Sequence, residues 1–163
     1  KLLQTILPLL IEREMMQLIF SMTARFNDSW IASKGFTYRQ SDYHMDRFDF
    51  NPIFISSPRL QIRQANFEDI SDLCSIESAC FTEIHSEPFM RYANLLCDPD
   101  YFIVVANFQG QNIGKAHLRW QEQEAQFFDI GILPKFQKRG FGGELIASCI
   151  NFSLQKGKAK QAL

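Results

Sequence analysis

The sequence predicts an α/β fold in which a twisted sheet carries helices on both faces. Segments with the two-residue alternation of strands and segments with helical spacing follow one another along the chain, as in mixed sheets. At 163 residues the chain is long enough for one sizeable core but short for two complete domains. Sixteen phenylalanines supply apolar volume for such a core and argue against a disordered chain.

Residues 51–58 are rich in proline and serine, which predicts a connector between a first part, 1–50, and a second part, 59–163. The first part predicts a helix, a buried strand, a short helix and two strands. In the short helix, Asn27 or Asp28 is a suitable N-cap and Gly35 a suitable end. The corresponding ranges are 2–14, 17–26, 27–36 and 36–50.

The second part predicts the order strand, helix, helix, strand, strand, strand, helix. Asn66 is a good N-cap for the first of these helices, and Pro88 suits the first turn of the second. A turn around 109–112 separates two of the strands. The ranges are 60–65, 66–81, 86–97, 100–121 for the strand pair, 124–133 and 142–158.

Composition indicates a cytoplasmic protein and excludes several kinds of partner. The net charge of −1 gives no drive towards nucleic acid or a membrane surface, and no segment reads as a signal peptide or a membrane span. The four cysteines have neither paired metal-ligand spacing nor a C-x-x-C motif. We therefore expect reduced thiols, no bound metal, no nucleic acid and no membrane association.

A glycine-rich turn joins the strand at 124–133 to the last helix. Gly140, Gly142 and Gly143 allow the backbone to bend tightly and to approach a ligand closely. Amides at a helix start lack intrahelical partners and suit a phosphate, and Lys138 and Arg139 add positive charge. The P-loop pattern is absent, and the dinucleotide fingerprint fails because residue 145 is leucine. The other interpretation is a glycine-rich helix start that binds nothing.

The hexapeptide Gln137-Lys138-Arg139-Gly140-Phe141-Gly142 resembles the Q/R-x-x-G-x-G/A signature of the GCN5-related N-acetyltransferases, the GNAT superfamily. The order of elements over residues 59–156 is similar to that family as well. The resemblance implies a mostly antiparallel twisted sheet and a site for acetyl-CoA as co-substrate. The residues that it implies for coenzyme binding are Ile130, Gly131, Ile132, Leu133, Gln137, Lys138, Arg139, Gly140, Phe141, Gly142 and Gly143.

Residues 1–50 resemble the elements that the family places after this helix. This predicts a fragment spanning two tandem GNAT repeats, with the back of one repeat followed by the front of the next. Residues 1–50 could then complete the fold of 59–163 within one chain, or by exchange in a homodimer. In the first case we expect residues 17–24 to lie near residues 125–133.

The resemblance implies an N-acetyltransferase that moves an acetyl group from acetyl-CoA to a small-molecule or peptide amine by direct attack. Asp129, Glu83 and His85 are the candidate catalytic residues. Asp129 is equally consistent with a hydrogen-bonded strand residue, and the other two with solvated loop residues. Gln126 stands where some members have a glutamate base, and no tyrosine acid is found near Trp30. Either the acid lies beyond Leu163, or water serves, or the first repeat is a degenerate, non-catalytic copy. The alternatives are a non-catalytic GNAT-like module that binds acyl-CoA or a partner, and a structural domain without coenzyme.

Overall fold

The computed structural model describes residues 29, 32, 33, 35, 37, 45–81, 87–158 and 160–163. The chain forms two compact units, Lys1–Asp42 and Tyr43–Leu163. In the first unit the Ser33 amide donates to the Ser29 carbonyl over 3.0 Å, and Gly35 has a φ of +84°, consistent with a short helix that ends at Gly35. The other elements predicted before residue 45 lie outside the described residues.

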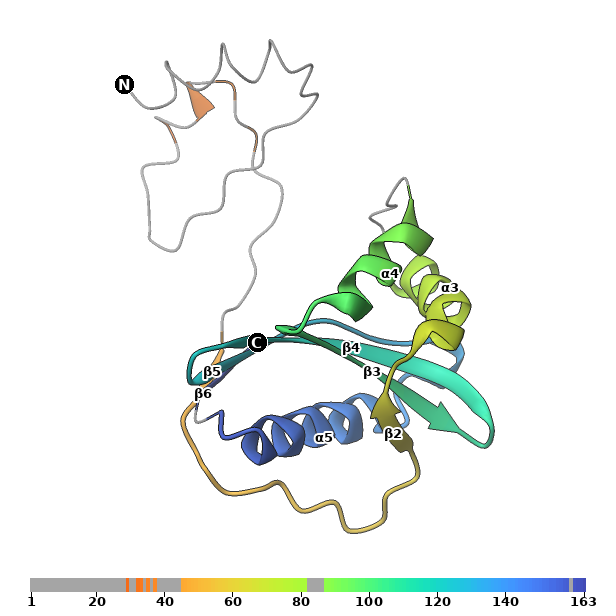
Figure 1. Cartoon of the computed structure of the whole chain (residues 1–163), viewed down its shortest axis with the longest axis vertical. Coiled ribbons are helices and arrows are strands. Elements are labelled where there is room, and N and C mark those ends of the chain that lie inside the picture. Colours follow the sequence, from red (N-terminus) through yellow and green to blue (C-terminus); the bar gives the residue numbers. More distant parts are fainter. Residues whose placement is uncertain are drawn as a thin grey trace. The chain divides into compact units, whose positions relative to one another are not determined.

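The described part of the second unit contains one six-stranded sheet, with the strand order β1-β6-β5-β4-β3-β2 (Figure 1). Neighbouring strands are antiparallel except β5 and β6, which are parallel. This confirms the predicted mixed, mostly antiparallel sheet. The strands are β1 Asp46–Arg47, β2 Gln61–Gln64, β3 Tyr101–Phe108, β4 Gln111–Gln121, β5 Glu124–Ile132 and β6 Lys160–Ala162.

Helices cover both faces of this sheet. Helices α3 (Ile70–Cys80) and α4 (Pro88–Cys97) lie on one face, and α5 (Phe141–Gln155) lies on the other (Figure 1). Single 3-10 turns, Phe67–Asp69 and Pro134–Phe136, precede α3 and follow β5. Within the described ranges, no helix is both long enough and apolar enough to cross a membrane.

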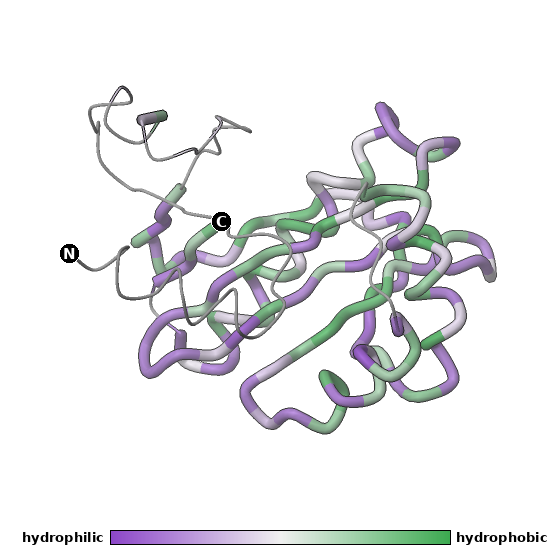
Figure 2. Tube along the Cα trace, turned by 90° about the horizontal axis from the view of Figure 1, so that it is seen from above, coloured by the Kyte–Doolittle hydropathy of each residue, from purple (hydrophilic) through white to green (hydrophobic). Residues whose placement is uncertain are grey.

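Alternation along the strands explains the two layers. In β3, Ile103 and Val105 pack on the side of α3 and α4, while Val104 and Ala106 pack on the side of α5. All four side chains are buried. Figure 2 shows hydrophobic stretches along the strands and helices and hydrophilic residues at the turns. Two apolar faces on one sheet therefore require a helical layer on each side.

The predicted helix starts are confirmed. The Asn66 side chain accepts from the Glu68 amide, and the Asp69 carboxylate accepts from the Asn66 amide, each over 2.8 Å. This reciprocal arrangement is a capping box, and it begins the 3-10 turn that leads into α3. Pro88 is the first residue of α4, where its missing amide proton costs no hydrogen bond.

The C-terminal end differs from the expectation that the elements end with a helix. Residues 160–162 form β6, parallel to β5, and β1 pairs with the other edge of β6. Main-chain hydrogen bonds of 2.8 and 2.9 Å join Met45 and Leu163. Three residues are too short for an alternation to be read in the sequence. Residues 45–47 thus share the sheet of the second part. Residues 17–24 lie outside the described residues, and the tandem-repeat origin stays a prediction.

Candidate active site

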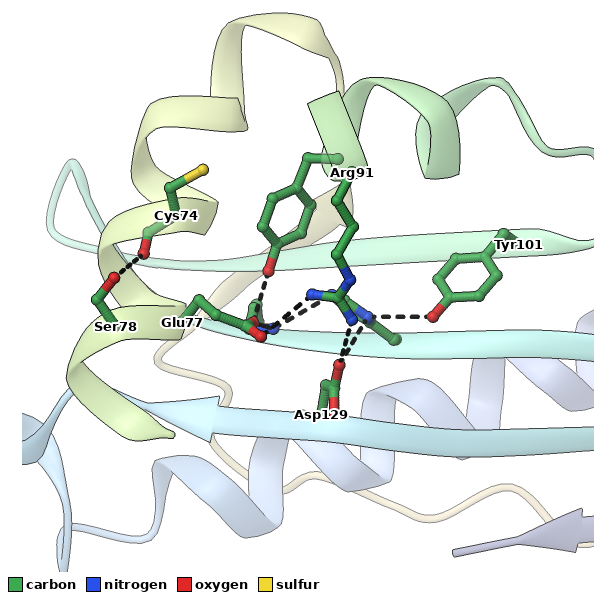
Figure 3. A network of polar contacts seen from close by, with 9 residues as sticks. Cys74, Glu77, Ser78, Arg91, Tyr101 and Asp129 are labelled. Carbon is green, nitrogen blue, oxygen red and sulfur yellow. Dashed lines mark hydrogen bonds and ion pairs between the residues drawn. The ribbon is translucent and has the colours of Figure 1, made fainter. Parts of the chain in front are cut away.

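A β-bulge interrupts β5 next to β4. His117 pairs with Phe128 and Lys115 with Gly131, so Ala116 alone faces both Asp129 and Ile130. Asp129 has a φ of +49°, in the left-handed region that aspartate tolerates better than most residues. A bulge leaves its extra residue out of the strand ladder and redirects a side chain. Here it turns the Asp129 carboxylate towards α4, where it meets Arg91 (Figure 3).

On either side of the bulge, one edge of β5 is open. Strand β6 pairs with β5 only at Glu124, Ala125 and Gln126. From Phe127 to Ile132 this edge has no strand partner among the residues that the structure describes. Unpaired main-chain amides and carbonyls of this kind can bind an extended ligand as an added strand.

The glycine-rich turn lies at the end of β5. The Gln137 side chain donates to the Ile132 carbonyl over 2.8 Å and so ties the turn to the strand. Lys138 and Gly140 have φ values of +59° and +84°, and α5 begins directly afterwards at Phe141. A Cβ added at Gly142 or Gly143 would have no atom within 4 Å. The first turn of α5 therefore presents main-chain amides to open space.

Arg59 borders this turn and was not singled out from the sequence. Its Nη2 donates to the Arg139 carbonyl over 2.8 Å, and its guanidinium lies 4.4 Å from the centre of the Phe141 ring. Nearby, Glu144 accepts from the amides of Arg59 and Leu60, each over 2.7 Å. These contacts hold Arg59 and Leu60 against the first turns of α5, beside a cavity of about 320 Å³ that residues 53–57 also line. No sequence motif marks Arg59, because its partners are 80 or more residues away.

A buried polar network lies on the other side of the sheet, between α3, α4 and β4 (Figure 3). Lys115 donates to Glu77, and Tyr92 donates to the same Glu77 oxygen over 2.7 Å. Arg91 bridges the two carboxylates. Its Nη1 lies 3.1 Å from Glu77 Oε1, and its Nη2 lies 3.1 Å from Asp129 Oδ2. Every buried side-chain nitrogen and oxygen of the described residues has a hydrogen-bond partner. The Asp129 carboxylate is thus the outer end of a network that begins inside the protein.

His117 completes the network beneath Asp129. Its Nδ1 lies 3.4 Å from Asp129 Oδ2 and 3.4 Å from the Tyr101 hydroxyl, and its Nε2 lies 3.3 Å from Lys115 Nζ. The rings of Tyr92, Tyr101 and Phe128 surround the imidazole with centroid distances of 5.6 to 5.8 Å. Lys115 and His117 were not singled out from the sequence. Two polar residues spaced by two in "IGKAHL" were the only available signal.

Burial sets the protonation of these groups. It lowers the pKa of His117 to about 2, with the charges of Lys115 and Arg91 acting in the same direction, so the imidazole is neutral. Burial also opposes ionisation of Glu77, but hydrogen bonds from Lys115 and Tyr92 outweigh it and lower the pKa of Glu77. Burial raises the pKa of Tyr101 to about 12, which keeps its hydroxyl protonated. The network therefore holds an ionised Glu77 beside a neutral His117.

The remaining predicted site residues fall in three places. Glu83 and His85 lie outside the described residues. Gln126 hydrogen-bonds to Gln121 and Glu124 at the start of β5, away from the bulge. Residues 130–133 lie at and after the bulge, and the Leu133 amide already donates to the Ile113 carbonyl over 2.8 Å. Among the described ranges, no three histidine, cysteine or acidic side chains are grouped so that they could hold a metal ion.

Comparison with known proteins finds similarity to one family. The model of the acetyltransferase (GNAT) family matches residues 70–163. The structure is similar to ribosomal-protein-S18-alanine N-acetyltransferase from Escherichia coli, with a TM-score of 0.55 and 20% identity over 61% of this chain and 62% of that one. The chain therefore spans less than two thirds of the length of that enzyme. No curated protein matches the chain by sequence.

Two further solved structures have the same fold. One is a GNAT family acetyltransferase from Staphylococcus aureus, with a TM-score of 0.54 and 19% identity over 61% of this chain and 82% of that one. The other is an aminoglycoside 6'-N-acetyltransferase from Acinetobacter baumannii, with a TM-score of 0.54 and 12% identity over 63% of this chain and 76% of that one. At these identities the likeness concerns the fold and says nothing about the acceptor.

Proposed function

Because this chain belongs to the acetyltransferase (GNAT) family, we propose that it transfers an acetyl group from acetyl-CoA to an amine. One observation carries the proposal. The open edge of β5, from Phe127 to Ile132, has the partly exposed Asp129 carboxylate in its middle and leads at its end to the glycine-rich turn. An extended donor molecule and a proton acceptor can therefore meet at the bulge.

The residues of the turn fit a pyrophosphate. The space beside Gly142 and Gly143, which a side chain would fill, supports a close approach to the amides of the first turn of α5. Lys138 and Arg139 add positive charge beside these amides. The open edge of β5 would pair with the amides of the pantetheine arm. Acetyl-CoA, when bound, would supply an acetyl group activated as a thioester.

The chain's own residues account for the other requirements of the reaction. The amine nitrogen forms a bond to the acetyl carbonyl carbon, the carbon–sulfur bond breaks, and the sulfur leaves as a thiolate. We propose that the main-chain amide at Ile130, in the bulge, stabilises the negative charge on the carbonyl oxygen. Asp129 accepts the proton that the amine loses, directly or through water.

Arg91 holds this carboxylate from one side. Its Nη2 contacts Asp129 Oδ2, and Asp129 Oδ1 makes no hydrogen bond or ion pair with any residue that the structure describes. Side chains of both residues are partly exposed, at 26% and 31%. The free oxygen is thus the one available to the acceptor amine. The acceptor that we propose is a small-molecule or peptide amine, and four free cysteines support a cytoplasmic location.

The test is release of free coenzyme A from acetyl-CoA in the presence of a panel of amines, with Asp129→Asn as the variant. We expect at least one amine to be acetylated and kcat to fall about a hundredfold in the variant, with little change in the KM for acetyl-CoA. Asp100→Asn, at an exposed carboxylate before β3, is the matched control and should leave the rate unchanged. Binding of acetyl-CoA without transfer to any amine would instead favour a non-catalytic module.

A further inference from the structure

His117 is a buried residue of β4 whose imidazole lies against the Asp129 carboxylate. Its side chain has no exposed surface, so it cannot touch a substrate. Both ring nitrogens nevertheless lie within 3.4 Å of polar groups from other residues. The charged and titratable groups that face the ring or its partners are Lys115, Asp129, Tyr101, Arg91, Glu77 and Tyr92.

Lys115 determines which ring nitrogen carries the proton. A lysine ammonium has three donors and no acceptor, and Lys115 Nζ lies 3.3 Å from Nε2 of His117. Nε2 must therefore accept. A neutral imidazole has one N–H, so the proton is on Nδ1. Burial lowers the pKa of Lys115, and Glu77 opposes this as its counter-ion, because it accepts a hydrogen bond from the same ammonium.

The Nδ1 proton then has two oxygens nearby, the Tyr101 hydroxyl within hydrogen-bond geometry and the Asp129 carboxylate as a charge contact. Asp129 Oδ2 and the Tyr101 hydroxyl oxygen are each 3.4 Å from Nδ1. We propose that His117 is a positioning residue for Asp129, and that Lys115 and Glu77 hold its imidazole as the Nδ1–H tautomer that faces the Asp129 carboxylate. The tautomer is independent of the reaction, while the positioning role rests on the proposed function.

Arg91 and His117 both lie next to the same oxygen of Asp129, Oδ2. Arg91 approaches Oδ2 from α4 at 3.1 Å, and His117 approaches it from β4. The carboxylate is thereby held in one orientation, with Oδ1 directed away from both. Without a donor at Nδ1, only the partly exposed Arg91 would fix this orientation. A loosely held carboxylate would spend less time in the geometry that proton transfer requires.

The tautomer can be measured without any substrate. Long-range ¹H–¹⁵N spectra of the full, ¹⁵N-labelled chain distinguish a protonated ring nitrogen from an unprotonated one. The chain has three histidines, so His117→Gln identifies the resonances of His117. We expect a protonated Nδ1 and an unprotonated Nε2 at neutral pH. A protonated Nε2, or both nitrogens protonated, would overturn the proposal whether or not the chain is an enzyme.

A second experiment tests the positioning role. The amide nitrogen of asparagine can occupy the place of Nδ1, so His117→Asn keeps a donor towards Asp129, whereas His117→Leu does not. With an amine accepted in the assay above, we expect kcat to fall about tenfold or more in His117→Leu and to recover most of this loss in His117→Asn. The KM for acetyl-CoA should change little in either. Equal losses in two variants with native circular dichroism would show that the residue is only structural.

Lys115→Met provides the test of what holds the tautomer. Once the ammonium is removed, nothing obliges Nε2 to accept, so we expect its resonance to move towards that of a protonated nitrogen. An unchanged Nδ1–H tautomer in a folded variant would contradict the role of Lys115. If Lys115→Met does not fold, the spectrum of the parent chain still decides the tautomer.

Discussion

Lys115 of β4 donates a hydrogen bond to Glu77 of α3 inside the protein, where the two side chains are 0% and 8% exposed. Taking two charges out of water is costly, and their attraction offsets this only when the geometry is good. Glu77 also accepts from Tyr92 and from Arg91, so both of its oxygens have donors. The pair thereby joins α3, α4 and the sheet directly beneath the candidate active site.

Removing one partner of this pair should destabilise the protein strongly. Glu77→Gln or Lys115→Met alone leaves a buried group without its counter-charge, and we expect each to lower the free energy of unfolding by about 3–5 kcal/mol. The double variant should lose clearly less than the sum of the two. Urea unfolding of the four proteins gives the coupling energy. Additive losses would mean that the two side chains do not act as a pair.

Acid should weaken the fold through His117 before the carboxylates titrate. Its pKa is about 2 in the folded protein, against 6.5 for an ordinary histidine, because burial and then the charges of Lys115 and Arg91 oppose protonation. Between these values the unfolded chain binds a proton that the folded protein does not. The free energy of unfolding should therefore decrease as the pH is lowered below 6.5, by about 1.4 kcal/mol per pH unit.

Unfolding measured between pH 6.5 and pH 5 isolates this effect, because ordinary carboxylates stay ionised there. His117→Asn, which cannot take up the proton, should show a much flatter dependence. The same slope in both proteins would mean that His117 is protonated in the folded state.

The capping box at residue 66 should contribute measurably to the stability of the α3 region. Asn66→Ala removes the acceptor for the Glu68 amide, and we expect a loss of about 1 kcal/mol in the free energy of unfolding. Asn66→Asp keeps an oxygen in the same place and should remain within a few tenths of the parent. Thermal or urea unfolding distinguishes these results. A neutral Asn66→Ala would show that other contacts hold this helix start.

Two glycines of the turn should respond to alanine in opposite directions. Gly140 has a φ of +84°, and a Cβ there would lie 3.2 Å from Arg59 Nη2, so Gly140→Ala should cost about 1–2 kcal/mol. Gly142 is in α5 with open space around it, so Gly142→Ala should add up to about 1 kcal/mol of stability. The urea midpoint of each variant is compared with that of the parent chain. A shift in the same direction for both variants would contradict this distinction.

The order of elements from residue 60 to residue 158 followed from the sequence because each has a clear local signal. Asn66 and Pro88 mark helix starts, and alternation marks β3, β4 and β5. Strand β6 was not predicted, since three residues are too few to show the alternation of apolar and polar residues that indicates a strand. The family resemblance placed Asp129 and the glycine-rich turn on the same strand and loop where the structure has them.

The network under Asp129 could not be predicted, because it depends on tertiary contacts. Lys115 and His117 occupy the polar positions of an alternating strand, and only the packing of α3 and α4 shows that this face is buried. The segment "DIGIL" likewise has no local sequence signal for a bulge, since the bulge arises from the register between β4 and β5. Positions that local patterns misread are thus concentrated at the candidate site, as expected where function competes with regular structure.

Calorimetric titration of acetyl-CoA into the full chain and into Gly142→Glu tests the central claim most directly. The glutamate would fill the space beside the first turn of α5 and repel a pyrophosphate, while Ser71→Glu on α3 adds the same charge elsewhere. We predict saturable binding to the parent and to Ser71→Glu, and loss of binding in Gly142→Glu with its circular dichroism unchanged. Absence of binding to the parent, or equal affinity in Gly142→Glu, would contradict the account.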